Sequence, residues 1–290
     1  MKKMTLQNYV VFRKGKLGHK EVQARVVSAK EPPGSFPIKK DFAAVGSSLI
    51  AGYWIPYRSR GVSKGPILGL IQSWNGESRI RKALESLSSV CDQIICLDDG
   101  STDGTVSVMR SFKKVSKIIR RPAQKVPWSH PEPVTRNLLL RAADAVKPIY
   151  CLSLDDDEEL EDPEAVRELI LKMSPPAVHL GVVDLWNRED RARIMLVEGR
   201  PRTAGRVWRW RTNASVRSTY LHCGSLPEVP DFWSLPDIRI LHWGLFSPAV
   251  RKTKHDRYNR LDPGGAMNGM GYRHFISSNN VFPFAKRRKV

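Results

Sequence analysis

The sequence predicts an α/β fold in which helices flank a mostly parallel, Rossmann-like β-sheet. Apolar runs of strand length alternate with segments of helical periodicity, an arrangement typical of parallel sheets. In addition, three of the apolar runs lead directly into polar segments. The carboxyl ends of parallel strands lie at one edge of a sheet, where ligands bind. We therefore expect the three polar segments to form one crevice.

The first half of the chain has the clearest element patterns. The segment 78–89, for example, places Ile80, Ala83, Leu84 and Leu87 at helical spacing. The other elements expected in this half are strands at 67–71, 93–97, 116–119 and 149–154 and helices at 106–112 and 134–146.

The second half contains more strand-like segments and predicts a smaller, β-containing part of the fold. A helix at 163–173 comes first, because a Pro follows an Asp at its start. Strand-like runs follow at 178–186, 193–197 and 205–210, and a basic helix is expected at 248–260.

Three consecutive aspartates, Asp155 to Asp157, follow the apolar run 149–154. Carboxylates this close repel and raise one another's pKa. A divalent cation at the strand end would keep them ionised, and carboxylate oxygens suit Mg²⁺ or Mn²⁺. The alternative is a solvated acidic turn before the helix that starts near Asp162.

Two further polar segments follow strands. Asp98-Asp99-Gly100-Ser101-Thr102-Asp103-Gly104-Thr105 comes after the run 93–97, and its two glycines permit a sharp turn close to a ligand. Gln72-Ser73-Trp74-Asn75-Gly76-Glu77 comes after the run 67–71.

These segments together resemble family 2 glycosyltransferases of the GT-A fold. The resemblance rests on residues 71–77, 97–105, Arg136-Asn137 and 154–158, and it covers about residues 66–260. It implies a nucleoside-diphosphate-sugar donor and a divalent metal, Mn²⁺ or Mg²⁺. The family usually has proline where Gln72 stands, so this chain departs from the pattern at the entry to its first loop.

The resemblance implies roles for individual residues. Trp74 and Glu77 match positions that line the nucleotide pocket, Asp98 and Asp99 match the acid that binds the base or ribose, and Arg136 matches a basic residue near the diphosphate. The candidate nucleotide-sugar-binding residues are thus Gln72, Trp74, Glu77, Asp98, Asp99, Arg136 and Asp156. Asp155 and Asp157 match the metal-binding pair, with Asp157 the better candidate for direct coordination.

Leu241-His242-Trp243-Gly244 is similar to a Leu-His-x-Gly string that precedes a basic helix in this family. The resemblance makes His242 a third candidate metal ligand, and a neutral imidazole can serve as one beside carboxylates. The alternative is a hydrogen-bonded histidine at a strand end. The same two interpretations apply to His222, for which a functional role has less support.

An inverting transferase needs a carboxylate base near the acceptor hydroxyl. Glu189, Asp190 and Glu228 are the candidates in the half expected to hold the acceptor. The sequence does not choose among them, and it does not indicate whether the anomeric configuration is inverted or retained.

The predicted organisation has three parts. Residues 1–65 form a basic N-terminal extension with one hairpin, and residues 66–260 form the transferase domain, divided into a nucleotide-sugar half (66–160) and an acceptor half (161–260). Residues 261–290 form a basic segment whose glycines indicate flexibility or an active-site lid.

The net charge of +19 is concentrated at the two ends of the chain. Residues 1–65 hold 13 Lys and Arg against 3 acidic residues and residues 247–290 hold 10 against 2, whereas the residues between hold 25 against 24. Basic segments attract polyanions. The candidate anionic partners are DNA, an acidic glycan acceptor and a membrane surface.

No apolar run of 18 residues predicts a membrane span, and the N-terminal residues lack the apolar core of a signal peptide. The four cysteines lack metal-finger spacing and are expected to be reduced. These patterns predict a cytoplasmic protein, with peripheral membrane association left open.

The leading hypothesis is a metal-dependent enzyme that moves a sugar from a nucleoside diphosphate to an acceptor hydroxyl, with a glycan or modified DNA as a candidate acceptor. The basic ends favour one alternative, a non-catalytic nucleic-acid-binding protein on the same core. A nucleotidyltransferase is another, although the sequence lacks the glycine-rich basic loop expected after its first strand.

Overall fold

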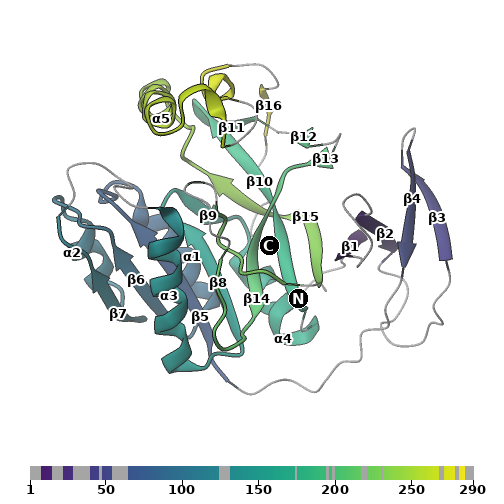
Figure 1. Ribbon diagram of the computed structural model, residues 1–290, viewed down its shortest axis with the longest axis horizontal. Coiled ribbons are helices and arrows are strands. Elements are labelled where there is room, and N and C mark those ends of the chain that lie inside the picture. Colours follow the sequence, from purple (N-terminus) through teal and green to yellow (C-terminus); the bar gives the residue numbers. More distant parts are fainter. Residues whose placement is uncertain are drawn as a thin grey trace.

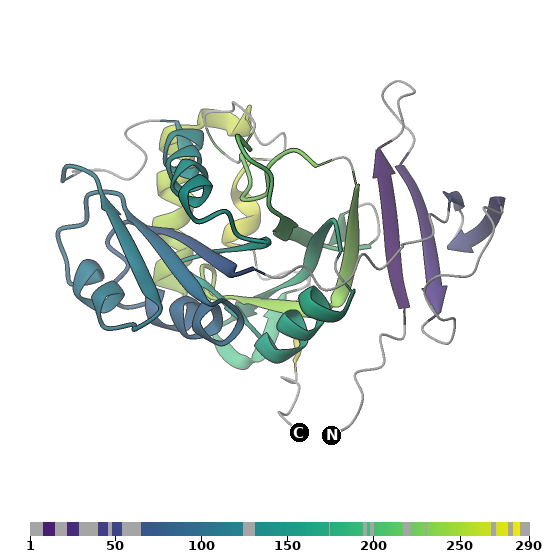
Figure 2. The same cartoon turned by 90° about the horizontal axis from the view of Figure 1, so that it is seen from below.

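The computed structural model describes residues 8–14, 22–28, 40–45, 48–53, 65–123, 131–173, 175–193, 196–197, 200–216, 221, 223–229, 231–267, 271–277 and 281–284. A mixed sheet forms the centre of the molecule, with helices on both of its faces (Figures 1 and 2).

The first half of the chain folds into four parallel strands, as the sequence predicts. They are β5 (Ile67–Ser73), β6 (Gln93–Asp98), β7 (Val115–Arg120) and β8 (Tyr150–Asp155). Their order in the sheet is β8-β5-β6-β7, and every neighbouring pair is parallel. Their carboxyl ends therefore lie at one edge.

Helices cover the two faces of these strands because each presents one apolar side. The helices are α1 (Ile80–Val90), α2 (Thr105–Arg110), α3 (Glu132–Val146) and α4 (Pro163–Met173). α1 and α4 bury their apolar residues in one core cluster with Ile67 and Ile71, whereas α3 packs with Leu68 and Leu70 in another. Alternate residues of β5 thus face opposite sides of the sheet.

The second half continues the same sheet with strands of mixed direction. The neighbours of β8 are, in order, β14 (Thr203–Arg209), β10 (Ala177–Trp186) and β15 (Asp231–His242). β14 is antiparallel to β8 and β10, whereas β10 and β15 are parallel. This half agrees with the smaller, β-containing part that the sequence predicts.

Shorter strands complete this half. They are β9 (Glu158–Leu160), which pairs with β15, β11 (Arg188–Arg193), which pairs with β10, β16 (Val281–Pro283), which pairs with β11, and the two-residue pair β12 (Leu196–Val197) and β13 (Arg200–Pro201). The strand expected at 193–197 includes the last residue of β11 and the two residues of β12, and residues 194–195 lie outside the described residues.

Helix α5 (Pro248–Leu261) follows β15 and lies near the carboxyl end of β10, where Arg251 stacks on Trp186 (Figure 1). Its start is fixed by Pro248 and by Ser247, whose Oγ accepts a hydrogen bond from the Val250 N–H at 3.2 Å. Beyond it come the 3₁₀ turns Pro263–Gly265 and Arg273–Phe275. Tyr272 donates its hydroxyl to the buried Asp262 at 2.6 Å, which ties these turns to the end of α5. Residues 268–270 of the expected flexible segment lie outside the described residues.

The predicted N-terminal hairpin consists of β1 (Asn8–Lys14) and β2 (Val22–Ser28), and β1 also pairs antiparallel with β15. A second hairpin comprises β3 (Lys40–Val45) and β4 (Ser48–Tyr53). The rest of 1–64 and the basic residues 285–290 lie outside the described residues. Within the part of the chain that is described, every helix is too short or too polar to cross a membrane.

Candidate active site

A cavity of about 590 Å³ lies at the carboxyl ends of β5, β6, β8 and β15. Polar segments that are far apart in the sequence converge there, as expected from the parallel strands. Of the sequence-predicted residues, the cavity is lined by Gln72, Trp74, Asp99, Arg136, Asp155, Asp156, Asp157 and His242. We call this cavity the aspartate cleft.

Asp155, at the end of β8, is held by two arginines. Its Oδ1 accepts a hydrogen bond from Arg136 Nη2 at 2.8 Å, and its Oδ2 accepts one from Arg206 Nη2 at 2.9 Å. Burial alone would raise the pKa of Asp155, but Arg206 and Arg136 outweigh burial and hold this pKa below its usual range. Asp155 is therefore ionised and already neutralised by the protein.

The two arginines also bind the buried Glu158 and the partly buried Glu132, so they form one network with Asp155. Arg206 contacts Glu158 Oε1 at 2.6 Å and Oε2 at 2.8 Å, and Arg136 contacts Glu132 Oε1 at 3.0 Å. Each guanidinium thus lies between two carboxylates, a geometry that suits its planar donor fork.

Asp156 forms a bidentate pair with Arg79. Arg79 Nε donates to Oδ1 at 3.0 Å and Nη2 donates to Oδ2 at 2.9 Å, while the Ser73 hydroxyl donates to Oδ2 as well. Arg79 also donates to the main-chain carbonyls of Trp74 and Asn75. This arginine therefore fastens the loop after β5 to the acidic turn after β8.

Asp157 has different partners, Lys254 of α5 and His242 of β15. Lys254 Nζ lies 3.2 Å from Asp157 Oδ2, and His242 Nε2 lies 3.5 Å from the same oxygen. Burial alone would raise the pKa of Asp157, but Lys254 and His242 lower it well below its usual range. The carboxylate is therefore ionised.

His242 is oriented by Asp184 on β10. Its Nδ1 lies 2.6 Å from Asp184 Oδ1, and Asp184 is a buried carboxylate also paired with Arg193 and Arg202. Because the pKa of Asp184 is held far below its usual range by Arg202 and its other partners against the effect of burial, this carboxylate can only accept. Nδ1 therefore carries a proton, and in the neutral imidazole the lone pair is on Nε2, toward Asp157 and Lys254.

Gly244 leaves open the space in which these three side chains meet. A Cβ at this position would lie 2.1 Å from Asp157 Oδ2, 2.4 Å from His242 Nε2 and 2.5 Å from Lys254 Nζ. The three atoms thus surround one point beside the backbone of Gly244, and any larger residue would fill that point.

The two aspartates at the carboxyl end of β6 point to different places. Asp98 is fully buried away from the cleft, where it accepts from the Ser101 N–H at 3.1 Å and pairs with Arg120 at 3.2 Å. Asp99 lines the cleft and accepts from Arg121 Nη1 at 2.9 Å. Burial raises the pKa of Asp99 to about 6, against the opposing effect of Arg121.

The loop after β5 supplies Gln72 and Trp74. Gln72 Oε1 and Trp74 Nε1 are both buried, and neither has a hydrogen-bond partner among the described residues. Buried polar atoms in proteins nearly always have partners, so this acceptor and this donor indicate a place where a ligand bonds. Glu77 does not line the cleft; its Oε2 accepts from the Gly104 N–H at 2.9 Å, so it braces the loop after β6.

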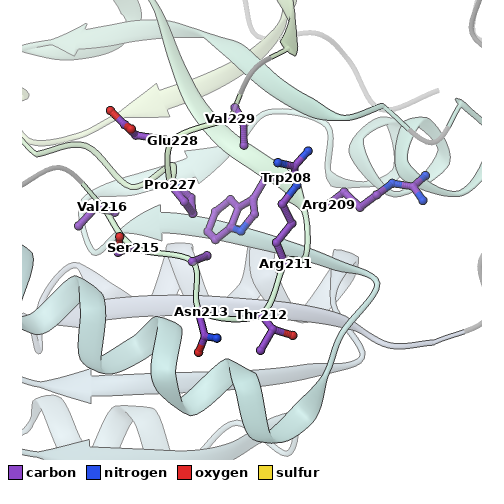
Figure 3. Close-up of a pocket in the computed structure, with 11 residues that line it drawn as sticks. Trp208, Arg209, Arg211, Thr212, Asn213, Ser215, Val216, Pro227, Glu228 and Val229 are labelled. Carbon is purple, nitrogen blue, oxygen red and sulfur yellow. The ribbon is translucent and has the colours of Figure 1, made fainter.

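The three candidate bases lie elsewhere. Asp190 is exposed on β11 and pairs with Arg188 at 2.8 Å, and its neighbour Glu189 is exposed as well. Glu228 belongs to a separate cavity of about 500 Å³, and Figure 3 shows its carboxylate directed away from the indole of Trp208. None of the three lines the aspartate cleft. His222 lies outside the described residues.

Four charged residues that the sequence did not single out also line the cleft. They are Arg79, Glu132, Lys254 and Arg257. The basic pattern of the helix at 248–260 is a signal for the last two, although it does not show which of its six basic or histidine residues face inward. Arg79 and Glu132 belong to no motif in the sequence, and only the packing of the folded chain places them at the cleft.

The donor set around Gly244 fits a divalent cation. Asp157 offers a carboxylate oxygen and His242 an imidazole nitrogen, and the hydrogen bond that His242 Nδ1 donates to Asp184 is the outer contact that metal-binding histidines typically have. Because imidazole favours transition metals, this pair suits Mn²⁺ better than Mg²⁺. Among the described residues, no three His, Cys, Asp or Glu side chains form a complete metal cage. Ions of this kind are often held by one or two side chains, with substrate phosphates and water as the other ligands.

A family model provides the first comparison with known proteins. The model described as glycosyl transferase family 2 matches residues 70–218, which is half of the chain and includes half of the residues that line the aspartate cleft.

Two curated relatives are similar to part of the chain. The chain is 28% identical over 216 residues to an uncharacterized protein of Mycobacterium tuberculosis, a match covering 71% of this chain and 53% of the relative. It is 30% identical over 109 residues to the lipopolysaccharide core biosynthesis glycosyltransferase LpsC of Rhizobium meliloti, covering 38% of this chain and 37% of LpsC. The chain thus spans about half the length of the mycobacterial relative.

Two solved structures are similar at low identity. A crystal structure of S. aureus TarS 1–349 has a TM-score of 0.45 and 14% identity, covering 72% of this chain and 69% of that one. Glucosyl-3-phosphoglycerate synthase from Mycobacterium tuberculosis, in complex with Mn²⁺, UDP and glucosyl-3-phosphoglycerate, has a TM-score of 0.31 and 22% identity, covering 41% of this chain and 44% of that one.

Proposed function

Because this chain belongs to glycosyl transferase family 2, we propose that its aspartate cleft transfers a sugar from a nucleoside diphosphate to an acceptor hydroxyl. The observation that carries the proposal is the convergence of Asp99, Asp155, Asp156, Asp157 and His242 on one cavity, each from the end of a strand or the turn after it. The sequence left open a nucleotidyltransferase and a non-catalytic nucleic-acid-binding protein. Family membership favours a glycosyltransferase over both.

The loops after β5 and β6 would bind the nucleoside. Asp99 offers a carboxylate to donors of the base or ribose, and Gln72 Oε1 and Trp74 Nε1 offer an acceptor and a donor that lack partners among the described residues. Glu77 and Asp98 would act indirectly, since Glu77 braces the loop after β6 and Asp98 bonds to the Ser101 N–H within it.

The centre of the cleft would bind the diphosphate. Arg79, Arg136, Lys254 and Arg257 line it, and guanidinium groups suit the planar, bidentate recognition of phosphate. Asp157 and His242 would hold a divalent cation here, which when bound would stabilise the negative charge on the departing diphosphate. Asp155 and Asp156 are committed to arginines, so their part is to fix the position of those arginines around the donor.

The acceptor side is less defined. Glu189, Asp190 and Glu228 do not line the cleft, so its geometry lends their proposed role as a base no support. An anionic acceptor remains a prediction from the charge of the two chain ends, much of which lies outside the described residues.

A thermal-shift screen tests the proposal. A ligand that binds only the native state stabilises it by about 2.7 kcal/mol at one hundred times its Kd. We expect at least one of UDP, GDP, ADP or CDP to raise the Tm of the protein by about 5 °C in the presence of Mn²⁺.

Two variants locate the binding. D157N should lose most of the Mn²⁺-dependent shift, whereas E228Q, in the other cavity, should retain it. Absence of any nucleotide shift, or loss of the shift in E228Q with retention in D157N, would contradict the proposal.

A further inference from the structure

We propose that Lys254 is a built-in cation that occupies the divalent-metal position between Asp157 and His242, so that Lys254 and a metal ion exclude one another there. This inference rests on the proposed function, since it concerns the same cation site. It assigns Lys254 a second task beyond contact with the diphosphate, which is to set how tightly the site binds metal.

The geometry places the ammonium on the same two atoms that would bind a metal. Lys254 Nζ lies 3.2 Å from Asp157 Oδ2 and 3.3 Å from His242 Nε2. Asp184 bonds to the other imidazole nitrogen, which leaves Nε2 facing Asp157 and Lys254. The ammonium thus occupies the place that a metal ion bound to these two side chains would need.

The cleft gives these groups a single meeting point. Asp157 Oδ2, His242 Nε2 and Lys254 Nζ all lie within 2.5 Å of the position that a Cβ of Gly244 would take. Two cations cannot share this space, because like charges at such a distance repel strongly in a partly buried site. A metal ion must therefore displace the ammonium in order to bind.

Helix α5 holds Lys254 at this point. Near its first turn, Arg251 donates to the carbonyls of Leu245 and Phe246 at 2.8 and 2.9 Å and to Asn187 Oδ1 at 2.8 Å, and its guanidinium stacks on Trp186. The helix start is therefore anchored to β10 and to the turn after β15. Lys254 follows one turn later, so its ammonium is tethered to the site at a high effective concentration.

Displacement would not remove the ammonium from the cleft. The lysine side chain is flexible and its helix is anchored, so a released Lys254 stays in a cavity that also contains Arg79 and Arg257. A diphosphate in the cleft would offer the released ammonium a new anionic partner.

The experiment is a titration of each protein with MnCl₂ alone, without nucleotide, by isothermal calorimetry. We expect K254M to bind Mn²⁺ at least about tenfold more tightly than the unaltered chain, because close charge pairs are coupled by this amount or more. K254Q, which removes the charge but keeps a polar chain of similar length, serves as the second variant if K254M does not fold by circular dichroism.

Two controls separate site occupancy from a general change in charge. R257M removes one positive charge from the same cavity wall, and K252M removes one from the exposed face of the same helix. Both should raise Mn²⁺ affinity by much less than K254M does. The double variant D157N/K254M should lose the gain entirely.

An Mn²⁺ affinity of K254M and K254Q equal to or weaker than that of the unaltered chain would overturn the inference, and so would a gain in R257M as large as that in K254M. If that occurs while UDP or another nucleotide still stabilises the protein with Mn²⁺, the proposed function stands and only the role of Lys254 fails. If neither Mn²⁺ nor any nucleotide binds, both fail together.

Discussion

Asp155 and Asp157 are two residues apart in one acidic turn, yet the protein neutralises them in different ways. Asp155 lies between the guanidinium groups of Arg136 and Arg206, which are themselves paired with Glu132 and Glu158. Asp157 faces one ammonium and one imidazole, and the space beside them is kept open by Gly244.

The comparison separates a structural carboxylate from an exchangeable one. Arginines held on both sides by carboxylates are fixed in position, and removing one leaves buried charges unpaired. A lysine on a flexible chain is a point charge that another cation can replace. The Asp-x-Asp pattern therefore does not make its two carboxylates equivalent, and the second is the one that we propose as the metal ligand.

Removing an arginine from the network around Asp155 should lower the stability of the protein strongly. R206M removes the partner of Glu158, whose side chain is 4% exposed, and one of the two partners of Asp155. Breaking a buried pair in this way costs about 3–5 kcal/mol, so the free energy of unfolding should fall by that amount. Urea denaturation at neutral pH measures it.

The matched control for R206M is R188M. Arg188 and Asp190 form an ion pair at 2.8 Å, but both side chains are largely exposed. Exposed pairs contribute little to stability, so R188M should unfold at nearly the same urea concentration as the unaltered chain. Equal losses in the two variants would show that the Arg206 network is not structural.

A side chain at position 244 should weaken the binding of a cation by Asp157 and His242. G244A places a methyl group 2.1–2.5 Å from Asp157 Oδ2, His242 Nε2 and Lys254 Nζ, so these atoms must move apart. Overpacking costs about 1–3 kcal/mol, and if this cost falls on the metal-bound state the Mn²⁺ affinity in the presence of nucleotide should fall by about fivefold to 150-fold.

G76A sharpens the same test, because its Cβ would approach Ser73 Oγ at 2.1 Å and Asp156 Oδ2 at 2.7 Å and would not touch the pair formed by Asp157 and His242. Calorimetric titration with Mn²⁺ should therefore show a much smaller change in G76A than in G244A. The reverse order would place the cation on the arginine side of the turn.

The smallest effect concerns pH. The pKa of Asp99 is raised to about 6 by burial, so this carboxyl is mostly protonated at pH 5 and mostly ionised at pH 7. If the ionised form accepts from the nucleoside, nucleotide affinity should rise by up to about tenfold from pH 5 to pH 7. Fluorescence titration with the nucleotide at both pH values measures the change in affinity. In D99N the affinity should be nearly the same at pH 5 and pH 7. An equal rise in D99N would assign the effect to another group.

The parallel half of the fold could be predicted from the sequence because its signals are local. The strands that become β5, β6 and β8 are apolar runs, and α1 carries its burial pattern in its own spacing. Two strands of the second half, β15 and β11, could not be predicted from the sequence. β15 contains Pro236, next to which the register with β10 shifts, and four of the six residues of β11 are exposed, so neither shows a simple apolar pattern.

The candidate site could be predicted in part for the same reason. Asp155, Asp156 and Asp157 are adjacent, and their position after a strand indicates a cleft. Their partners could not be read in this way, because Arg206 lies 51 positions from Asp155 and Lys254 lies 97 from Asp157. Both Asp98 and Asp99 were candidates for the acid that binds the base or ribose, but consecutive residues at a strand end point to opposite sides, and only Asp99 lines the cleft.

The central claim is that Asp157 and His242 hold a cation in a nucleotide-binding cleft. Crystals soaked with MnCl₂ and the nucleoside diphosphate that gives the largest thermal shift test it most directly, by anomalous scattering at the manganese edge. We expect one strong peak in contact with Asp157 Oδ2, His242 Nε2 and the diphosphate, with Lys254 moved away from both side chains. A peak bound instead by Asp155, or a nucleotide seated in the cavity beside Glu228, would contradict it.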